Sequence, residues 1–351
     1  MLHIYEIADH VHAAMPGKRF TAYSPFRVSF GGGGTDISPF CDNYGGAVVN
    51  TTIDRGVTVI YTPDDYDLEI SSRDFLKSVL IGKDTGDNEV LSKMTKLLES
   101  KGISKGRIAI NSGVPPGSGL GSSSALTTAL LKLIYLIQGK SVDPWNLARE
   151  AFSLEHDYFG ITLGKQDPFA VSLGNFKYME FASGKELSTD LSRYPDFMAE
   201  LEKRTLLVYT GNTRESTSVL QEQVEKSRHG DSDIVSNLKV MKNLATEMKN
   251  SVLSGNFEGF SSAVNAGWDI KKQLGKKVSN ERIDSLISFA LDNGAQAAKL
   301  MGGGSDGFLL VISRHGSVQQ LQKALMDSSN FVVRVSFDRN GTRAFQSSEA
   351  E

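Results

Sequence analysis

A loop rich in glycine and serine leads directly into an apolar run at residues 114–137, VPPGSGLGSSSALTTALLKLIYLI. After the serines, apolar residues recur at the spacing of one helix face, which predicts a helix from about residue 122. Glycines let a backbone approach a ligand closely, and the first turn of a helix attracts anions. Serines also cap ordinary helices. The residues alone therefore support a phosphate-binding loop and a serine-capped core helix equally.

Two well-known nucleotide loops are excluded by their patterns. The chain contains no Gly-x4-Gly-Lys-[Ser/Thr] sequence, so this loop is not a Walker loop. The letters GGGSDG at Gly302–Gly307 match Gly-x-Gly-x-x-Gly, but FLLVI follows them, which predicts a strand where a dinucleotide fold has a helix. Binding of NAD rests on this match alone and is not favoured.

The order of predicted elements indicates an α+β fold. We expect a strand at residues 19–30 broken at Pro25, and a strand–turn–strand unit over 47–63 with its turn at Asp54-Arg55-Gly56. We expect helices over 122–137 and 144–159. Residues 215–293 are mainly helical with a break at 254–256, and strands flank the glycine loop near residue 303. Residues 1–14 predict a short additional helix. A boundary near residue 200 gives two lobes, 1–200 and 201–351, with a cleft between them.

Composition excludes several classes of function. The 351 residues carry 38 basic and 41 acidic side chains, a formal charge of -3, so a nucleic-acid partner is not expected. There is no apolar run of the roughly 18 residues that span a bilayer, and no signal peptide is expected. The single cysteine, Cys41, is expected to be an ordinary buried side chain in a cytoplasmic protein. Whether the chain acts as a monomer or a homodimer is left open.

Four segments resemble the GHMP kinases, the family of galacto-, homoserine, mevalonate and phosphomevalonate kinases. They are the nucleotide motif VPPGSGLGSSSA, the N-terminal substrate motif SPFRVSFGGGGTD, the catalytic-aspartate segment GKQDPFA and the third motif AAKLMGGGSDGFLLVI. One branch of the family, the D-glycero-D-manno-heptose 7-phosphate kinases with related anomeric sugar kinases, is the most similar. Four features carry this similarity: GGGTD, YTGNTRES, GWDIKKQL and NGAQAAKLMGGG. The resemblance covers the chain except about the first 20 residues and the last few.

This resemblance implies a two-lobed α+β fold, with an N-terminal lobe like domain 2 of ribosomal protein S5 and a ferredoxin-like C-terminal lobe. It implies ATP and Mg²⁺ as cofactors and a sugar or sugar phosphate as partner. The implied reaction is the phosphorylation of an anomeric hydroxyl. The most similar branch implies that D-glycero-D-manno-heptose 7-phosphate is converted to the 1,7-bisphosphate. A fucose, galactose or mevalonate kinase, and a non-catalytic ligand-binding relative, are the alternatives.

For the nucleotide, the resemblance implies a loop that surrounds the triphosphate. Ser123 would also bind Mg²⁺ together with Glu155, whose alternative is a solvated helix residue. Ser122 and Ser124 would cap the helix or contact phosphate. The loop residues are Pro116, Gly117, Ser118, Gly119, Leu120, Gly121, Ser122, Ser123 and Ser124.

For catalysis, Asp167 is the candidate that accepts the proton of the sugar hydroxyl or orients that hydroxyl for attack. Arg27 resembles the family's arginine beside this aspartate, where it would stabilise charge on the transferring phosphoryl group. A surface-turn aspartate and a strand-edge arginine are the alternatives.

For the acceptor, the glycine bend is implied to bind sugar hydroxyls through Asp36, with an Asx turn as its alternative. Gly33, Gly34, Thr210 and Arg214 complete this set, although a helix start capped by Thr213 explains the YTGNTRES segment as well. A phosphate on the acceptor needs a basic partner, for which the candidates are Lys165, Arg214, Lys271 and Lys272. Trp268 is expected in the core, and Asp306 departs from the family's third motif, which usually has a glycine there.

Overall fold

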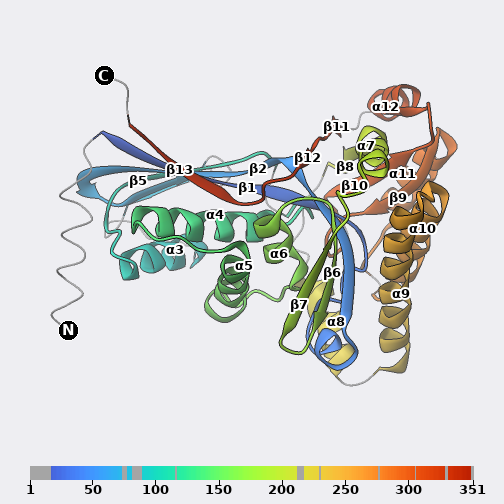
Figure 1. Ribbon diagram of the computed structural model, residues 1–351, viewed down its shortest axis with the longest axis horizontal. Coiled ribbons are helices and arrows are strands. Elements are labelled where there is room, and N and C mark those ends of the chain that lie inside the picture. The colour runs from blue at the N-terminus through green and yellow to red at the C-terminus, as the bar shows by residue number, and fades with distance from the viewer. Residues whose placement is uncertain are drawn as a thin grey trace.

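The computed structural model describes residues 17–72, 77–80, 89–114, 117–211, 217–228, 231–275, 277–304, 306–328 and 331–348. The short helix expected over residues 1–14 lies outside them. Figure 1 shows an elongated molecule with a large sheet at one end and a smaller, helix-covered sheet at the other. None of the helices in the described part is long and apolar enough to span a membrane.

The first sheet has nine strands among the described residues and the path order β13-β1-β2-β5-β3-β4. Off this path, β6 and β12 pair with β2, and β7 pairs with β6. The strands are β1 (Lys18–Gly31), β2 (Gly46–Asp67), β3 (Glu69–Ser72), β4 (Lys77–Leu80), β5 (Lys105–Ser112), β6 (Lys177–Ala182), β7 (Lys185–Asp190), β12 (Phe337–Asp338) and β13 (Arg343–Ser348).

The second sheet has four strands in the described part of the chain, in the order β11-β8-β10-β9. All its neighbouring strands are antiparallel. They are β8 (Thr205–Tyr209), β9 (Ala295–Leu300), β10 (Phe308–Ser313) and β11 (Phe331–Arg334).

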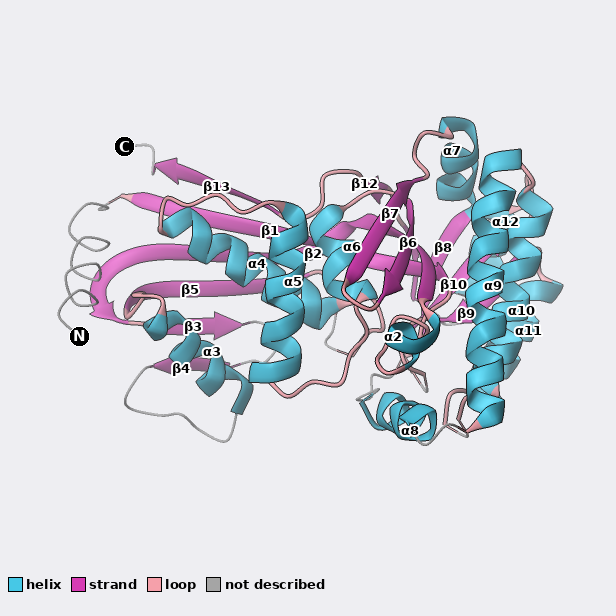
Figure 2. Cartoon of the chain, turned by 60° about the horizontal axis from the view of Figure 1, so that its bottom comes forward, coloured by secondary structure: helices cyan, strands magenta, loops and turns pink. Residues whose placement is uncertain are grey.

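One group of helices covers a face of the first sheet, and most of the remaining helices lie around the second sheet (Figures 1 and 2). The first group is α3 (Glu89–Ser100), α4 (Ser122–Ile137), α5 (Pro144–Ser153), the π-helical turn η1 (Leu154–Tyr158) and α6 (Gln166–Leu173). The others are α2 (Phe40–Tyr44), α7 (Pro195–Arg204), α8 (Thr217–Arg228), α9 (Ser232–Ser254), α10 (Phe257–Lys272), α11 (Glu281–Asp292) and α12 (Val318–Asp327).

Local chemistry explains where these helices start and stop. The expected break at residues 254–256 is confirmed, because Gly255 ends α9 in the left-handed conformation. Asn256 then caps α10 by accepting a hydrogen bond from the Gly259 N–H. Helix α4 begins where the serines follow the glycine loop, as the apolar spacing predicts.

The turn expected at Asp54-Arg55-Gly56 is wrong, because β2 runs through it as one long strand. Strand β1 stays paired with β2 on both sides of that point, Pro25 opposite Gly56 and Arg27 opposite Thr52. A register shift between Pro25 and Arg27 lets the two strands bend together. A Cβ on Gly56 would lie 2.3 Å from the Ser24 carbonyl oxygen, so this glycine permits the close approach.

The chain returns to the first sheet at its C-terminal end, where β12 pairs with β2 and β13 with β1. The boundary expected near residue 200 falls inside α7. The two sheets therefore do not divide the chain at a single point, and the division into lobes 1–200 and 201–351 stays a prediction.

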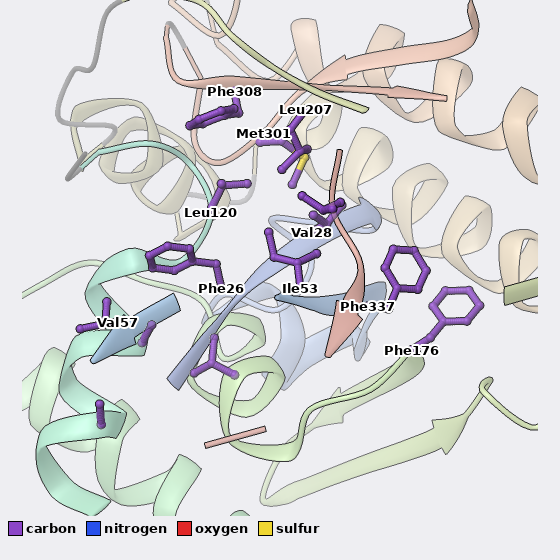
Figure 3. Packing of buried hydrophobic residues seen from close by; sticks show 14 of the residues in the cluster. Phe26, Val28, Ile53, Val57, Leu120, Phe176, Leu207, Met301, Phe308 and Phe337 are labelled. Atoms are coloured by element: carbon purple, nitrogen blue, oxygen red, sulfur yellow. The ribbon is translucent and has the colours of Figure 1, made fainter. Parts of the chain in front are cut away.

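One hydrophobic cluster joins the two sheets, as Figure 3 shows. Phe26 and Val28 of β1 lie in it with Leu207 of β8 and Phe308 of β10. Leu120, from the glycine–serine loop, is fully buried in the same cluster. Fully burying such a side chain contributes about 1.5–3 kcal/mol, so the core itself anchors the loop. Trp268 and Cys41 are buried, as expected.

Candidate active site

A cavity of about 200 Å³ opens where the glycine–serine loop, the glycine bend after β1 and the helices beside the second sheet meet. Its lining residues range from Arg27 to Gly303, so segments that are far apart in the sequence meet here. The start of α4 and the loop before α6 form one side, and α8, α9 and α10 contribute residues to the other. The two glycine-rich loops, although far apart in sequence, both reach this cavity.

The glycine–serine loop is shaped by three glycines in the left-handed region, with φ of 73° at Gly117, 79° at Gly119 and 73° at Gly121. A Cβ on Gly119 would lie 2.7 Å from the Met301 carbonyl oxygen, and one on Gly302 would lie 2.6 Å from Gly119 Cα. The third motif therefore packs its backbone against the backbone of this loop and holds it in place. Pro116, expected in the loop, lies outside the described residues.

The first turn of α4 faces the cavity through Ser122 and Ser123. Among the described residues no side chain caps this turn, so the expected serine cap is not formed. The first N–H groups of any helix lack acceptors within the helix, and here they stand at a cavity wall. This arrangement suits an anion, with the positive end of the helix dipole behind it.

The serine hydroxyls instead bind Glu155 of η1. The Ser123 and Ser124 Oγ atoms donate to the two carboxylate oxygens of Glu155, each at 2.6 Å. Glu155 is fully buried, which contradicts the solvated alternative. Burial raises the pKa of Glu155 to about 7, although the two serine hydrogen bonds favour its charged form.

A carboxylate and a hydroxyl side by side are hard oxygen ligands that fit Mg²⁺. No group of three potential His, Cys, Asp or Glu ligands occurs within the described ranges. A magnesium ion held by Ser123 and Glu155 would therefore need phosphate oxygens and water as its remaining ligands. That composition fits a metal that arrives with a nucleotide.

Arg27 and Asp167 form an ion pair in the cavity wall, with the guanidinium binding both carboxylate oxygens. The Nε–Oδ1 and Nη2–Oδ2 distances are both 2.8 Å. The Arg27 Nη1 atom donates to the Gly119 carbonyl oxygen at 2.5 Å, which fixes the pair against the glycine–serine loop. Such bidentate pairing is specific in geometry as well as strong. The expected neighbourhood of these two residues is confirmed, while their catalytic roles stay predictions.

Asp36 is held at the other end of the cavity by backbone donors on both sides. Its carboxylate accepts from the Gly34 N–H at 2.9 Å and from the Gln166 N–H at 2.8 Å. A Cβ on Gly164 would lie 1.9 Å from Asp36 Oδ2, so this loop needs a glycine there. Burial raises the pKa of Asp36, and the two backbone hydrogen bonds oppose that shift.

Of the four basic residues considered for an acceptor phosphate, Lys271 lines the cavity. Lys165 pairs with Glu186 at 3.4 Å, Lys272 pairs with Asp269 at 3.0 Å, and Arg214 lies outside the described residues. The Lys271 amine donates to the Gly302 carbonyl oxygen. Burial, with the nearby Arg27 charge, lowers the pKa of Lys271 to about 8.

Three further expectations concern residues at or near the glycine loops. Gly33 and Gly34 line the cavity as predicted. Thr210 is fully buried and its hydroxyl accepts from the Gly307 N–H at 3.0 Å, so it supports the third motif, and direct contact with substrate stays a prediction. Asp306 is not part of the cavity wall that the described residues form.

Among the cavity residues that sequence reasoning missed, four have polar side chains: Ser29, Gln166, Gln223 and Lys299. The Lys299 amine donates to the carbonyl oxygens of Ser29 and Phe30 at 3.0 and 3.2 Å, and burial lowers its pKa far below the usual value. A lysine within the apolar strand AQAAKL was a signal that could have found it. Gln223 reaches from α8 to the Gly34 carbonyl oxygen at 3.2 Å, and no pattern in its own helix marks it.

Comparison with known proteins agrees with this geometry. Residues 88–175 match the GHMP kinases N terminal domain. The chain is 30% identical to the D-glycero-alpha-D-manno-heptose 7-phosphate kinase of Campylobacter jejuni over 342 residues, which is 94% of this chain and 99% of that one. It is 26% identical to the galactokinase of Thermococcus kodakarensis, covering 87% and 92% of the two chains.

A solved structure extends the similarity to the whole fold. The D-glycero-D-manno-heptose 1-phosphate kinase from Bacteroides thetaiotaomicron superposes with a TM-score of 0.72 at 24% identity, covering 93% of this chain and 98% of that one. At that identity it supports the fold alone, whereas the Campylobacter jejuni relative matches in sequence over nearly its full length. By fold, by loop geometry and by this full-length similarity, the chain belongs to the GHMP kinase family.

Proposed function

We propose that the protein is an ATP-dependent sugar kinase that phosphorylates the anomeric hydroxyl of D-glycero-D-manno-heptose 7-phosphate to give the 1,7-bisphosphate. The full-length relative named as a heptose 7-phosphate kinase supports the choice of sugar. We also propose a cytoplasmic location, since the reaction consumes ATP and the only cysteine, Cys41, can form no internal disulfide.

The observation that carries the proposal is the Arg27–Asp167 pair between two differently built ends of one cavity. On one side lies the anion-binding start of α4, and on the other lies Asp36 with its glycine bend. Phosphoryl transfer depends mainly on positioning and on neutralising charge. This cavity supports both, because its acidic and basic side chains are fixed by hydrogen bonds before any substrate arrives.

In the proposed reaction, the glycine–serine loop and the first turn of α4 bind the triphosphate. Asp167 contacts the anomeric hydroxyl and either accepts its proton or orients it for in-line attack on the γ-phosphorus. Arg27 stabilises the charge on the transferring group and holds Asp167 in place. Ser123 and Glu155 would hold Mg²⁺, which when bound neutralises charge on the phosphate oxygens.

Lys271 is the residue we propose for the phosphate that the acceptor already carries. It is half-buried in the cavity wall and positively charged below a pKa of about 8. The other three candidates are either paired with an acid or outside the described residues. A single ammonium is a suitable point partner for a phosphate group.

A coupled ADP-release assay tests the function directly. The protein is mixed with ATP and Mg²⁺ and with heptose 7-phosphate, unphosphorylated heptose, fucose, galactose, other hexoses or mevalonate. We expect the highest kcat/KM for heptose 7-phosphate and a product that is phosphorylated at the anomeric carbon by phosphorus NMR. A higher kcat/KM for any other acceptor would replace the proposed substrate, and no turnover with any sugar would refute sugar kinase activity.

A further inference from the structure

Gly33 differs from the other glycines of its bend. A Cβ on Gly32 would lie 1.9 Å from the Ala47 carbonyl oxygen, and one on Gly34 would lie 2.9 Å from the Gln223 side chain. At Gly33 the nearest atoms would be Gln166 Nε2 and Ser29 Oγ, both at 3.8 Å, and the backbone is not in the left-handed region. Neither packing nor φ demands a glycine there, so the space over its Cα belongs to the cavity.

The two side chains beside that space are buried and incompletely hydrogen-bonded. Ser29 is 6% exposed and Gln166 is 4% exposed. Within the described residues, Ser29 Oγ and Gln166 Oε1 are buried atoms without a hydrogen-bond partner. Both residues line the cavity. Of the Gln166 amide, Nε2 is the atom nearest the gap and Oε1 is the unpaired atom. Buried polar groups normally have partners, so two side chains with unpaired atoms that flank the same gap point to a ligand that completes their hydrogen bonds.

The backbones of Ser29 and Gln166 are held by residues of the proposed catalytic site and its neighbours. Ser29 lies on β1 two residues after Arg27, and the Lys299 amine fixes its carbonyl oxygen. Gln166 immediately precedes Asp167, and its own N–H donates to Asp36. The two side chains are therefore held relative to both Asp167 and Asp36, although neither takes part in those contacts itself.

The chemistry of the pair selects the kind of group that fits. A serine hydroxyl and a glutamine amide are uncharged, and each can donate and accept a hydrogen bond. A hydroxyl also does both, so one hydroxyl can satisfy both side chains at once. A phosphate group, which only accepts when ionised, would be better matched to the cavity lysines.

We infer that Ser29, Gln166 and the space over Gly33 form a subsite for an acceptor hydroxyl other than the one that is phosphorylated. The inference rests on the proposed function, because it assigns a further part of the same acceptor. The subsite makes the enzyme selective for sugars that carry this hydroxyl, since a deoxy sugar would leave the two buried groups unpaired.

The first experiment measures kcat and KM of Ser29→Ala and Gln166→Met with heptose 7-phosphate and with ATP. We expect the KM for the acceptor to rise about tenfold, as for one lost hydrogen bond, while the KM for ATP stays within about twofold. The thermal midpoint of the empty protein is expected to stay equal or to rise, because an unpaired buried group is removed. A purely structural role would lower the midpoint and leave the KM ratio unchanged.

Gly33→Ala tests the space itself, with Gly267→Ala as the matched control. A Cβ at Gly267 would meet nothing within 4 Å, and its backbone is also outside the left-handed region. We expect Gly33→Ala to raise the acceptor KM at an unchanged thermal midpoint, whereas Gly267→Ala changes neither the acceptor KM nor the ATP KM.

A set of monodeoxy forms of heptose 7-phosphate then identifies the hydroxyl. One of them should lose about tenfold in kcat/KM with the wild type, and lose nothing further with Ser29→Ala or Gln166→Met. Unchanged acceptor KM in all three variants, or equal deoxy penalties in wild type and variants, would overturn the subsite. Wild-type turnover of heptose 7-phosphate in the same assay separates that outcome from failure of the proposed function.

Discussion

At the end of the cavity formed by the glycine–serine loop, backbone packs against backbone, and the Glu155 carboxylate is satisfied by serine hydroxyls. At the end formed by the glycine bend, Ser29 and Gln166 keep unpaired buried atoms around open space. Arg27 bonds to Gly119 of the first end, and Asp167 follows Gln166, whose N–H bonds to Asp36 of the second end. Within the described residues, Ser118 Oγ is a buried atom without a partner at the first end, whereas the second end keeps two such atoms on side chains beside open space. We therefore look for acceptor specificity at the second end.

The largest expected effect concerns the pair between the two ends. Asp167→Asn should lower kcat by about 10²- to 10⁴-fold, because the amide cannot accept a proton and has only one oxygen for Arg27. ATP affinity, measured by titration calorimetry, should change little, since Asp167 is not among the loop residues proposed to bind the triphosphate. Asp269→Asn, an exposed acid paired with Lys272, is the control. Near-wild-type kcat in Asp167→Asn would remove this residue from the mechanism.

A second change disrupts the backbone packing of the glycine–serine loop against the third motif. Gly119→Ala puts a Cβ 2.7 Å from the Met301 carbonyl oxygen at a φ of 79°. We expect a loss of about 1–3 kcal/mol in the free energy of unfolding by urea titration, with a raised KM for ATP. Gly139→Ala is matched, with a φ of 66° and nothing within 4 Å, and should cost on the order of 1 kcal/mol. Equal losses in both variants would show that the backbone contact contributes nothing.

A third change tests through pH how the acceptor phosphate is bound. Lys271 is charged below its pKa of about 8 and loses its proton above it. Its attraction for an anionic acceptor is therefore present at pH 7 and lost as the pH rises through 8, so kcat/KM for heptose 7-phosphate should fall there. Lys271→Met should lower kcat/KM about tenfold at pH 7 and remove this fall.

The neighbouring Lys272→Met serves as the control for that measurement, because Lys272 is partly exposed and paired with Asp269. It should keep the wild-type pH profile. If Lys271→Met lowers kcat/KM equally for phosphorylated and unphosphorylated heptose, Lys271 does not bind the acceptor phosphate.

The parts of the site that were predicted from the sequence are those for which a family motif implies both the residue and its neighbours. The helix after the serines and the approach of Arg27 to Asp167 are of this kind. The sequence did not predict that Ser123 and Ser124 would both donate to Glu155, so that Ser124 does not cap its own helix. A serine hydroxyl can bond to a carboxylate that is distant in sequence only when tertiary packing brings that carboxylate close, and the local sequence does not show this packing.

The same reason explains the missed residues. Ser29 reads as one polar residue in a strand, and its importance arises from Gln166, which only the fold brings beside it. The continuous course of β2 through Asp54-Arg55-Gly56 likewise depends on its pairing with β1, because the two strands bend together there and no separate turn forms. Local sequence patterns identify helices and strands, whereas contacts between distant segments determine which polar side chains lie close enough to form hydrogen bonds.

The pairing of β1 with β13 has a consequence for biosynthesis. Lys18 lies opposite Ser348, so the strand that carries Arg27 is joined along one edge by residues that are translated much later than the strand itself. Contacts of such large sequence separation form slowly and late. During translation that edge of β1 remains open, and open strand edges invite pairing with other chains. We therefore expect the nascent polypeptide to depend on chaperones until β13 has emerged.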